Sequence, residues 1–232
     1  MTLKIAMNDH DISNRSSILD AILAETQALG FKMASEPQTG SLLRTLAASK
    51  PHGKLLELGT GTGFGTVSIL AGMDANSSLD SVESDAAVLA VAQRYLAHDR
   101  RVTFHHEDGA VFLQRSQGQL FDFIYADTWP GKFTHLPEAL ALLAPGGLYI
   151  IDDLLPQPSW PEGHAPKVPR LIAELESRID LRVTKLCWAT GLIIASKYDH
   201  VADKTLELTA SRAGARVALA HLERSLTKVN KP

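Results

Sequence analysis

A glycine-rich turn after an acidic residue is the first stretch of this chain whose residue types suit ligand chemistry. Glu57 ends an apolar run, and the glycines Gly59, Gly61 and Gly63 alternate with threonines before a helix-like pattern begins at Phe64. Glycines so spaced let the backbone turn sharply and remove the Cβ atoms that would keep a ligand away. The helix that follows presents free N–H groups and the positive end of its dipole to an anionic ligand. The spacing predicts a nucleotide-type cofactor site at the carboxyl edge of a parallel sheet, with a purely structural turn as the alternative.

The register of the glycines bears on which cofactor this turn could bind. A dinucleotide-binding turn requires Gly-x-Gly-x-x-Gly directly after a strand. Counted from Gly59 the sixth position is Phe64, and counted from Gly61 it is Thr66. Neither register completes the pattern, which argues against a dinucleotide.

Acidic residues follow four further apolar runs that read as strands. Glu83 stands where a carboxylate can accept both hydroxyls of a ribose, and Asp108 where one could accept from an adenine amino group. Asp127 and the pair Asp152 and Asp153 follow the next two runs. Each acid alone could be a helix cap or a solvated loop residue. Together they lie on the edge where open α/β sheets bind ligands.

Strand-like and helix-like patterns alternate along the chain and would position these residues. Strands are expected at 54–58, 78–83, 102–106, 121–126, 148–151, 181–188 and 192–196. Helices are expected at 13–30, 64–71, 86–97, 110–116, 136–143, 168–178 and 206–226. The alternation predicts βαβ units and a doubly wound, mostly parallel α/β sheet. The last two strands are too close for a crossover helix, so they should form an antiparallel hairpin.

The turn and the strand order resemble motif I and the layout of the class I methyltransferases, which bind S-adenosylmethionine. The resemblance covers roughly residues 50–198 and implies one Rossmann-like core over 51–200. Residues 1–50 would form an amino-terminal helical cap, and 201–232 a carboxy-terminal helical extension. The implied cofactor contacts are Glu57, Gly59, Thr60, Gly61, Gly63, Phe64, Glu83, Ser84, Asp108, Gly109, Asp127 and Trp129.

Two segments, 121–129 and 148–153, resemble the paired motifs of the catechol and caffeoyl-CoA O-methyltransferases. In the metal-dependent members, an aspartate after the fourth strand and an acidic pair after the fifth hold a divalent cation. By motif position these are Asp127, Asp152 and Asp153, whose oxygens suit Mg²⁺ or a similar ion. Such a cation would stabilise a deprotonated hydroxyl of the acceptor. The resemblance implies O-methylation of an aromatic hydroxyl in a small molecule, with a cation as a possible assistant.

Two positions depart from that family. Asp153 stands where the animal and plant enzymes have asparagine. Three carboxylates would repel one another unless a cation binds, one acid is protonated, or a lysine such as Lys132 neutralises them. The position of the family's lysine base is Pro130, which leaves Lys132 as the nearest candidate base. A solvated loop lysine or an ion-pair partner is the alternative for Lys132.

A proline-rich segment, 154–169, follows the acidic pair. Trp160 could wall an aromatic acceptor, and His164 could act as a base near neutral pH. A rigid surface connection is the alternative, because prolines stiffen a loop. The candidate catalytic residues are therefore Asp127, Lys132 and His164.

Composition and charge limit the classes of molecule that this protein is expected to bind. The 232 residues carry a net charge of -3, which argues against a nucleic-acid binder dominated by phosphate contacts. The single cysteine, Cys187, lies in an apolar run and is expected to be a buried, inert thiol. No apolar run approaches the ~20 residues that span a bilayer. The amino terminus also lacks the apolar segment of a signal peptide, so a cytoplasmic location is expected.

Three functions remain open from the sequence. The first is a small-molecule O-methyltransferase. The second is a methyltransferase of the same fold that acts on a nitrogen of nucleic acid or protein, although an Asn/Asp-Pro-Pro-Tyr motif is missing after the fourth strand. The third is a non-catalytic, cofactor-binding interaction protein. The carboxy-terminal helix could pack on the domain or join two copies as a homodimer.

Overall fold

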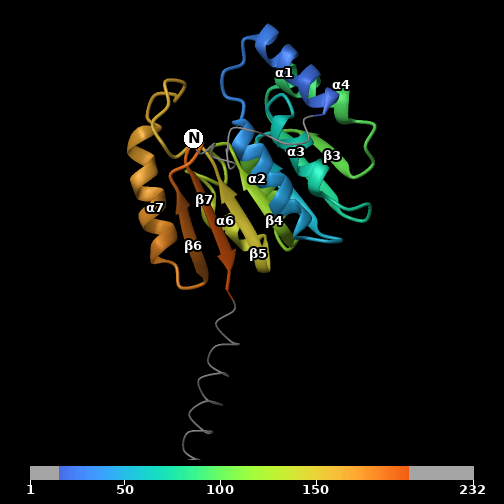
Figure 1. The fold of residues 1–232 in the computed structure, drawn as a ribbon. Coiled ribbons are helices and arrows are strands. Elements are labelled where there is room, and N and C mark those ends of the chain that lie inside the picture. Colours follow the sequence, from blue (N-terminus) through green and yellow to red (C-terminus); the bar gives the residue numbers. More distant parts are fainter. Residues whose placement is uncertain (1–15, 199–232) are drawn as a thin grey trace, which may run out of the picture. The chain divides into compact units, whose positions relative to one another are not determined.

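Seven strands form a single sheet at the centre of the described chain (Figure 1). The structure is a computed structural model and describes residues 16–198. The strands are β1 (Lys54–Leu58), β2 (Ser78–Glu83), β3 (Val102–His106), β4 (Phe121–Ala126), β5 (Leu143–Ile151), β6 (Leu181–Leu186) and β7 (Leu192–Lys197). Their order in space is β3-β2-β1-β4-β5-β7-β6. Strand β7 is antiparallel to both of its neighbours, and all other pairs are parallel.

This topology confirms the predicted fold class. The strand order reverses between β1 and β4, which lie side by side although β2 and β3 separate them in the sequence. At such a switch point the two flanking loops leave the sheet in opposite directions and open a crevice at the carboxyl ends of the strands. The predicted glycine turn follows β1, and Asp127 follows β4. Both therefore lie at this crevice.

Helices cover both faces of the sheet (Figure 1). They are α1 (Ser17–Leu29), α2 (Pro37–Ala48), α3 (Phe64–Gly72), α4 (Ala86–Leu96), α5 (Gly109–Arg115), α6 (Leu136–Ala141) and α7 (Val168–Ser177), with a short 3₁₀ turn at Ala165–Lys167. One buried cluster joins α5, α6 and α7 to the sheet through residues such as Phe112, Leu140 and Leu175. A second cluster joins the amino-terminal helices to the opposite face through Ile22, Leu43 and Ile69. Residues 16–197 belong to one compact unit, α1 and α2 included.

Helix α2 is an element that the sequence analysis did not predict. Pro37 is its first residue, a position where a missing N–H costs nothing. Gly40 weakens the helical signal, yet it lies so close to α3 that a Cβ there would be 2.7 Å from Ser68 Oγ. Leu43 and Ala47 are buried on the same side. Tertiary packing against α3 therefore stabilises a helix whose own residues favour it only weakly.

The remaining differences from the predicted elements lie at their ends. Strand β5 begins at Leu143 and runs through the expected turn at Gly146, with an irregularity in its register to β4. The Cys187 thiol is exposed, which corrects the expectation of a buried one, because β6 ends at Leu186 and leaves Cys187 in the hairpin loop. The predicted helix at 206–226 lies outside the described residues. Within residues 16–198, no helix has the length and apolar character needed to cross a membrane.

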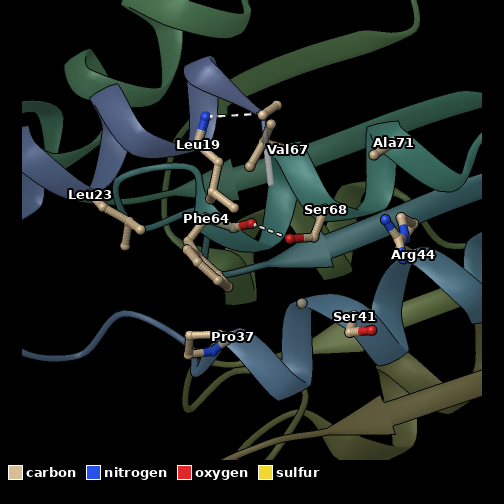
Figure 2. A pocket seen from close by; sticks show the side chains of 11 residues that line it. Leu19, Leu23, Pro37, Ser41, Arg44, Phe64, Val67, Ser68 and Ala71 are labelled. Carbon is tan, nitrogen blue, oxygen red and sulfur yellow. Dashed lines mark hydrogen bonds between the residues drawn. The ribbon is translucent and has the colours of Figure 1, made fainter. Parts of the chain in front are cut away.

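Helix α1 is fastened to the glycine turn. The side-chain oxygens of Thr26 and Thr62 lie 2.7 Å apart in a buried hydrogen bond. Figure 2 shows the mostly apolar groove that α1, α2 and α3 leave between them, with Leu19, Phe64 and Val67 among its lining residues. None of the acids at the strand ends lines this groove. The candidate site lies elsewhere, at the carboxyl ends of the strands.

Candidate active site

Two adjoining pockets open where β1, β2, β4 and β5 end. We name them the glycine-turn pocket and the aspartate pocket. The glycine-turn pocket is lined by residues that include Gly59, Thr60, Gly61, Thr62, Phe64, Glu83 and Ser84. The aspartate pocket is lined by residues that include Trp129, Lys132, Asp152, Asp153, His164 and Thr190. Met33, Ala34, Ser35, Asp127 and Thr128 line both. Molecules held in the two pockets would therefore meet beside Asp127.

The glycine turn depends on its glycines for both conformation and space. Gly59 has a φ of +99°, and a Cβ there would lie 2.9 Å from the Asp127 carbonyl oxygen. Gly59 N–H and Thr60 N–H both donate to the Val82 carbonyl, which holds the turn against the end of β2. Gly63, also at a φ of +99°, lies against Ala92 of α4 and does not line the pocket. The third glycine thus serves helix packing, while Gly59 and Gly61 form the pocket floor.

Glu83 is held at the mouth of the glycine-turn pocket by backbone amides. Its Oε2 accepts from Gly61 N–H at 2.9 Å, and its Oε1 accepts from Ser84 N–H at 2.9 Å and Asp85 N–H at 3.0 Å. These bonds fix the carboxylate and leave one lone pair, on Oε2, for a further donor, because each oxygen can accept two bonds. A rigid carboxylate beside a glycine turn is suited to a hydroxyl of a ribose.

Glu57 lies beneath the turn and is fully buried. Its Oε2 accepts from the hydroxyls of Thr66 at 2.5 Å and Ser81 at 2.6 Å, and its Oε1 has no partner. Burial raises the pKa of Glu57 to about 8, although the two hydroxyl donors oppose that rise. Glu57 lines neither pocket, and its unpartnered Oε1 lies against Gly65 of α3. Direct contact of Glu57 with a cofactor therefore stays a prediction.

The free energy of unfolding should fall as the pH rises from about 4.5 to about 8. In this window the unfolded Glu57 has lost its proton while the folded protein retains it, so the folded state binds more protons. A pKa difference of about 3.5 between the folded and unfolded states corresponds to roughly 5 kcal/mol. The raised pKa of Asp127 also lowers the free energy of unfolding as the pH rises to about 7. The contribution of Glu57 is therefore clearest between pH 7 and 8. Denaturant unfolding at several pH values should show a flatter profile for Glu57→Gln; equal slopes for parent and variant above pH 7 would refute this assignment.

Asp127 and Asp152 share one hydroxyl donor. Tyr125 Oη lies 2.9 Å from Asp152 Oδ2 and 3.2 Å from Asp127 Oδ2, and it has one hydrogen to donate. Burial raises the pKa of Asp127 to about 7, and the nearby charge of Asp152 adds to the rise. Burial also raises the pKa of Asp152. Two close carboxyls that cannot both ionise hold one proton between them near neutral pH.

A buried lysine lies against this pair. The Lys132 side chain is 2% exposed, and its Nζ donates to the Asp152 carbonyl oxygen at 3.0 Å. Asp127 Oδ1 lies 3.9 Å from the same Nζ, and the Asp127 side chain is 16% exposed. The ammonium therefore partly neutralises the charge of the Asp127 carboxylate. Asp127 still lines both pockets.

Asp153, Trp160 and His164 form a second group across the aspartate pocket. Asp153 has a φ of +65°, and its Oδ1 accepts from Trp160 Nε1 at 2.6 Å. The Trp160 and His164 rings stack with their centroids 4.3 Å apart. His164 Nε2 donates to the Asp153 carbonyl at 3.0 Å, and its buried Nδ1 has no hydrogen-bond partner among the described residues. Burial lowers the pKa of His164, so its imidazole is neutral at pH 7.

The three aspartates do not form the expected metal-ligand set. Among residues 16–198, no group of three His, Cys, Asp or Glu side chains is arranged to hold a metal ion. Asp152 Oδ1 already accepts from the Thr190 hydroxyl and the Asp153 N–H, and Asp153 Oδ1 is taken by Trp160. Lys132 also occupies the position of a neutralising cation. Asp127, Asp152 and Asp153 thus take part in a hydrogen-bond network of the protein, and their role as ligands of a divalent cation stays a prediction.

Other predicted cofactor residues lie around the glycine-turn pocket in different roles. Phe64, Glu83 and Ser84 line it directly, whereas Asp108 caps α5 by accepting from Ala110 N–H. Gly109 is packed against Pro130, and Trp129 lines the aspartate pocket. The glycine-turn pocket is therefore not lined by Asp108, Gly109 or Trp129. Asp108 and Gly109 form the start of α5, and Trp129 lies in the loop after β4, beside the aspartate pocket.

Three residues of the site were not singled out from the sequence. The Tyr125 hydroxyl bridges the two aspartates, the Ser35 hydroxyl lies 2.9 Å from Tyr125 Oη and 3.2 Å from Asp127 Oδ2, and Thr190 donates to Asp152. Tyr125 reads as a core aromatic within a buried strand. Ser35 and Thr190 lie far from Asp127 in the sequence, so only folding shows the contacts.

Comparison with protein families agrees with this architecture. Residues 56–154 match the family described as "Methyltransferase domain". A polyamine aminopropyltransferase of Vibrio vulnificus (strain CMCP6) is 38% identical over 87 residues, which are 34% of this chain and 28% of that protein. The match thus spans little more than a quarter of that relative's length.

Solved structures extend the likeness to most of the chain. An O-methyltransferase from Bacillus cereus, in complex with SAH, has a TM-score of 0.71 at 19% identity and covers 80% of this chain and 93% of its own. TomG from Streptomyces achromogenes, an O-methyltransferase of tomaymycin synthesis in complex with SAM, has a TM-score of 0.71 at 20% identity, with 80% and 92% covered. At these identities the likeness establishes the fold.

Proposed function

We propose that this chain is a class I S-adenosylmethionine-dependent methyltransferase that transfers a methyl group to a hydroxyl oxygen of a small molecule. The observation that carries the proposal is Asp127, a carboxyl with a pKa of about 7 on the wall common to both pockets. A general base works best when its pKa lies near the working pH. An aromatic hydroxyl, whose pKa is about 10, needs such a base.

The glycine-turn pocket fits S-adenosylmethionine. Gly59 and Gly61 line the pocket without side chains, and Glu83 Oε2 keeps a lone pair for a ribose hydroxyl. The bound cofactor supplies an electrophilic methyl group on a sulfonium. The solved relatives that hold SAH or SAM support this assignment.

The aspartate pocket would hold the acceptor. Asp127 would accept the proton from the acceptor hydroxyl, and the Tyr125 hydrogen bond would stabilise whichever carboxyl is ionised. Lys132 would offset the negative charge that develops on the acceptor oxygen, since its ammonium lies 3.9 Å from Asp127 Oδ1. The neutral His164, stacked on Trp160, would form the aromatic side of the pocket and offer Nδ1 as a second proton acceptor.

A methyl-transfer screen should give turnover of phenols and catechols that a chelator changes by less than about twofold. The physical reason is that Lys132 and the shared proton already neutralise the aspartates, so the base chemistry requires no divalent cation. The screen would include amines and peptides, with and without EDTA and added Mg²⁺, and would follow product methylation by mass spectrometry.

The outcomes of this screen separate the alternatives. Transfer to nitrogen alone would replace the oxygen acceptor with an amine. A strict Mg²⁺ requirement, together with loss of Mg²⁺-dependent turnover in Asp152→Asn, would restore the aspartates as metal ligands. Cofactor binding without transfer to any acceptor would favour a non-catalytic protein.

A further inference from the structure

A separate pocket with a basic lining lies between α7 and the loop that follows β4. We call it the α7 pocket. Its lining includes His135, Lys167 and Arg170, with Lys132 shared from the aspartate pocket and Glu174 at one side. The proposed methyl transfer uses neither His135, Lys167 nor Arg170.

Two cationic groups of the α7 pocket, Lys167 and Arg170, form no ion pair with a carboxylate of the described residues. Lys167 Nζ lies 4.9 Å from the centre of the Trp129 ring, a contact that holds an ammonium without neutralising it. Arg170 is exposed on the first turn of α7, and within residues 16–198 it has no hydrogen-bond or ion-pair partner. The Glu174 carboxylate is the one acidic group of the described lining.

His135 adds an unusual backbone and an unpaired nitrogen. It has a φ of +54°, in the left-handed region that residues other than glycine rarely adopt. Its Nδ1 is buried and has no partner among the described groups. His135 lines the α7 pocket, so a ligand there could provide the partner that Nδ1 lacks after a small rotation of the ring.

We propose that the α7 pocket binds the phosphate group of a free phosphate ion or a phosphate monoester. An arginine fork, a flexible ammonium and an imidazole nitrogen together form a donor set suited to a multivalent oxyanion. Trp129 lines the aspartate pocket and Phe133 lines the α7 pocket, with ring centroids 6.0 Å apart. The proposed ligand would thus bind beside the methyl acceptor, and Lys132 lines both pockets.

The test is calorimetric titration of the full chain with inorganic phosphate and with phenyl phosphate at fixed ionic strength, because salt screens such contacts. Lys167→Gln combined with Arg170→Gln should weaken the tighter probe by at least about tenfold. His135→Asn, which retains a residue that tolerates the left-handed region, should weaken it about threefold or more. Glu174→Gln should strengthen it. Equal affinity for both probes would identify the free ion, and tighter phenyl phosphate binding an organic phosphate.

The matched control removes the same charge from β6. Lys185→Gln with Arg182→Gln lies outside the α7 pocket and should bind both probes as the parent does. S-adenosylmethionine affinity should be unchanged in every variant, which shows that the fold is intact and makes the result independent of methyl transfer. The proposal is overturned if neither probe binds saturably, or if the α7 variants and the β6 control lose the same affinity.

Discussion

Asp127→Asn is expected to lower methyl transfer by about 10²- to 10⁴-fold while S-adenosylmethionine affinity changes by less than about threefold. Asparagine keeps the shape of the side chain and its hydrogen bonds with Tyr125 and Ser35, but it cannot take a proton. The parent rate should rise with pH through about 7, where Asp127 loses its proton, and this limb should disappear in the variant. Initial rates across pH, with calorimetry for the cofactor, provide both measurements.

The control for this variant is Asp108→Asn. Asp108 also follows a strand of the sheet, but it caps α5 and lines neither pocket, and asparagine caps helices as well as aspartate does. Its rate should equal that of the parent. A full rate in Asp127→Asn would exclude Asp127 as the base and leave His164. A parallel loss of cofactor affinity would assign Asp127 to cofactor binding instead.

Glu83→Ala is expected to weaken S-adenosylmethionine binding by about 100-fold. The free lone pair on Oε2 would accept from a ribose hydroxyl, and a hydrogen bond to a charged group contributes about 1.5–3 kcal/mol. The variant also removes the acceptor that holds Gly61 N–H and Ser84 N–H in place, so the turn loses part of its preorganisation. Isothermal titration with the cofactor measures the change.

Two further variants separate these contributions. Glu83→Gln retains one acceptor oxygen and should lose less affinity than Glu83→Ala. Glu107→Ala removes a carboxylate from the end of the neighbouring strand β3, where it pairs with Arg115 outside both pockets, and should bind the cofactor as the parent does. Unchanged affinity in Glu83→Ala would exclude Glu83 as the ribose acceptor.

Local signals in the sequence were sufficient for most of the fold. Each strand is a short apolar run followed by a turn or a cap, and each predicted helix within the described residues has an apolar face, so the period of the pattern identified both. Helix α2 was missed because Gly40 and polar neighbours conceal it, and its packing against α3 is a long-range property. The exposure of Cys187 was missed because an apolar run does not reveal where an edge strand ends.

The candidate site divides in the same way. The glycine turn, Glu83 and Asp127 were found because each follows a strand directly, and parallel strands bring their carboxyl ends to one edge. The contacts of the three aspartates could not be predicted from the sequence. The left-handed φ of Asp153 turns it toward Trp160, and Lys132 folds back from a loop to the Asp152 carbonyl.

The sequence by itself determined the sheet, its crevice and the acids that line it, because strand period, glycine conformation and chain direction are local properties of consecutive residues. Only the tertiary structure decided what those acids do. Burial, a shared Tyr125 hydroxyl and the Lys132 ammonium convert a set of carboxylates that resembled metal ligands into a proton-sharing pair. The protonation of a carboxyl depends on its distance to other charges and on its access to water, and both are set by residues far away in the chain.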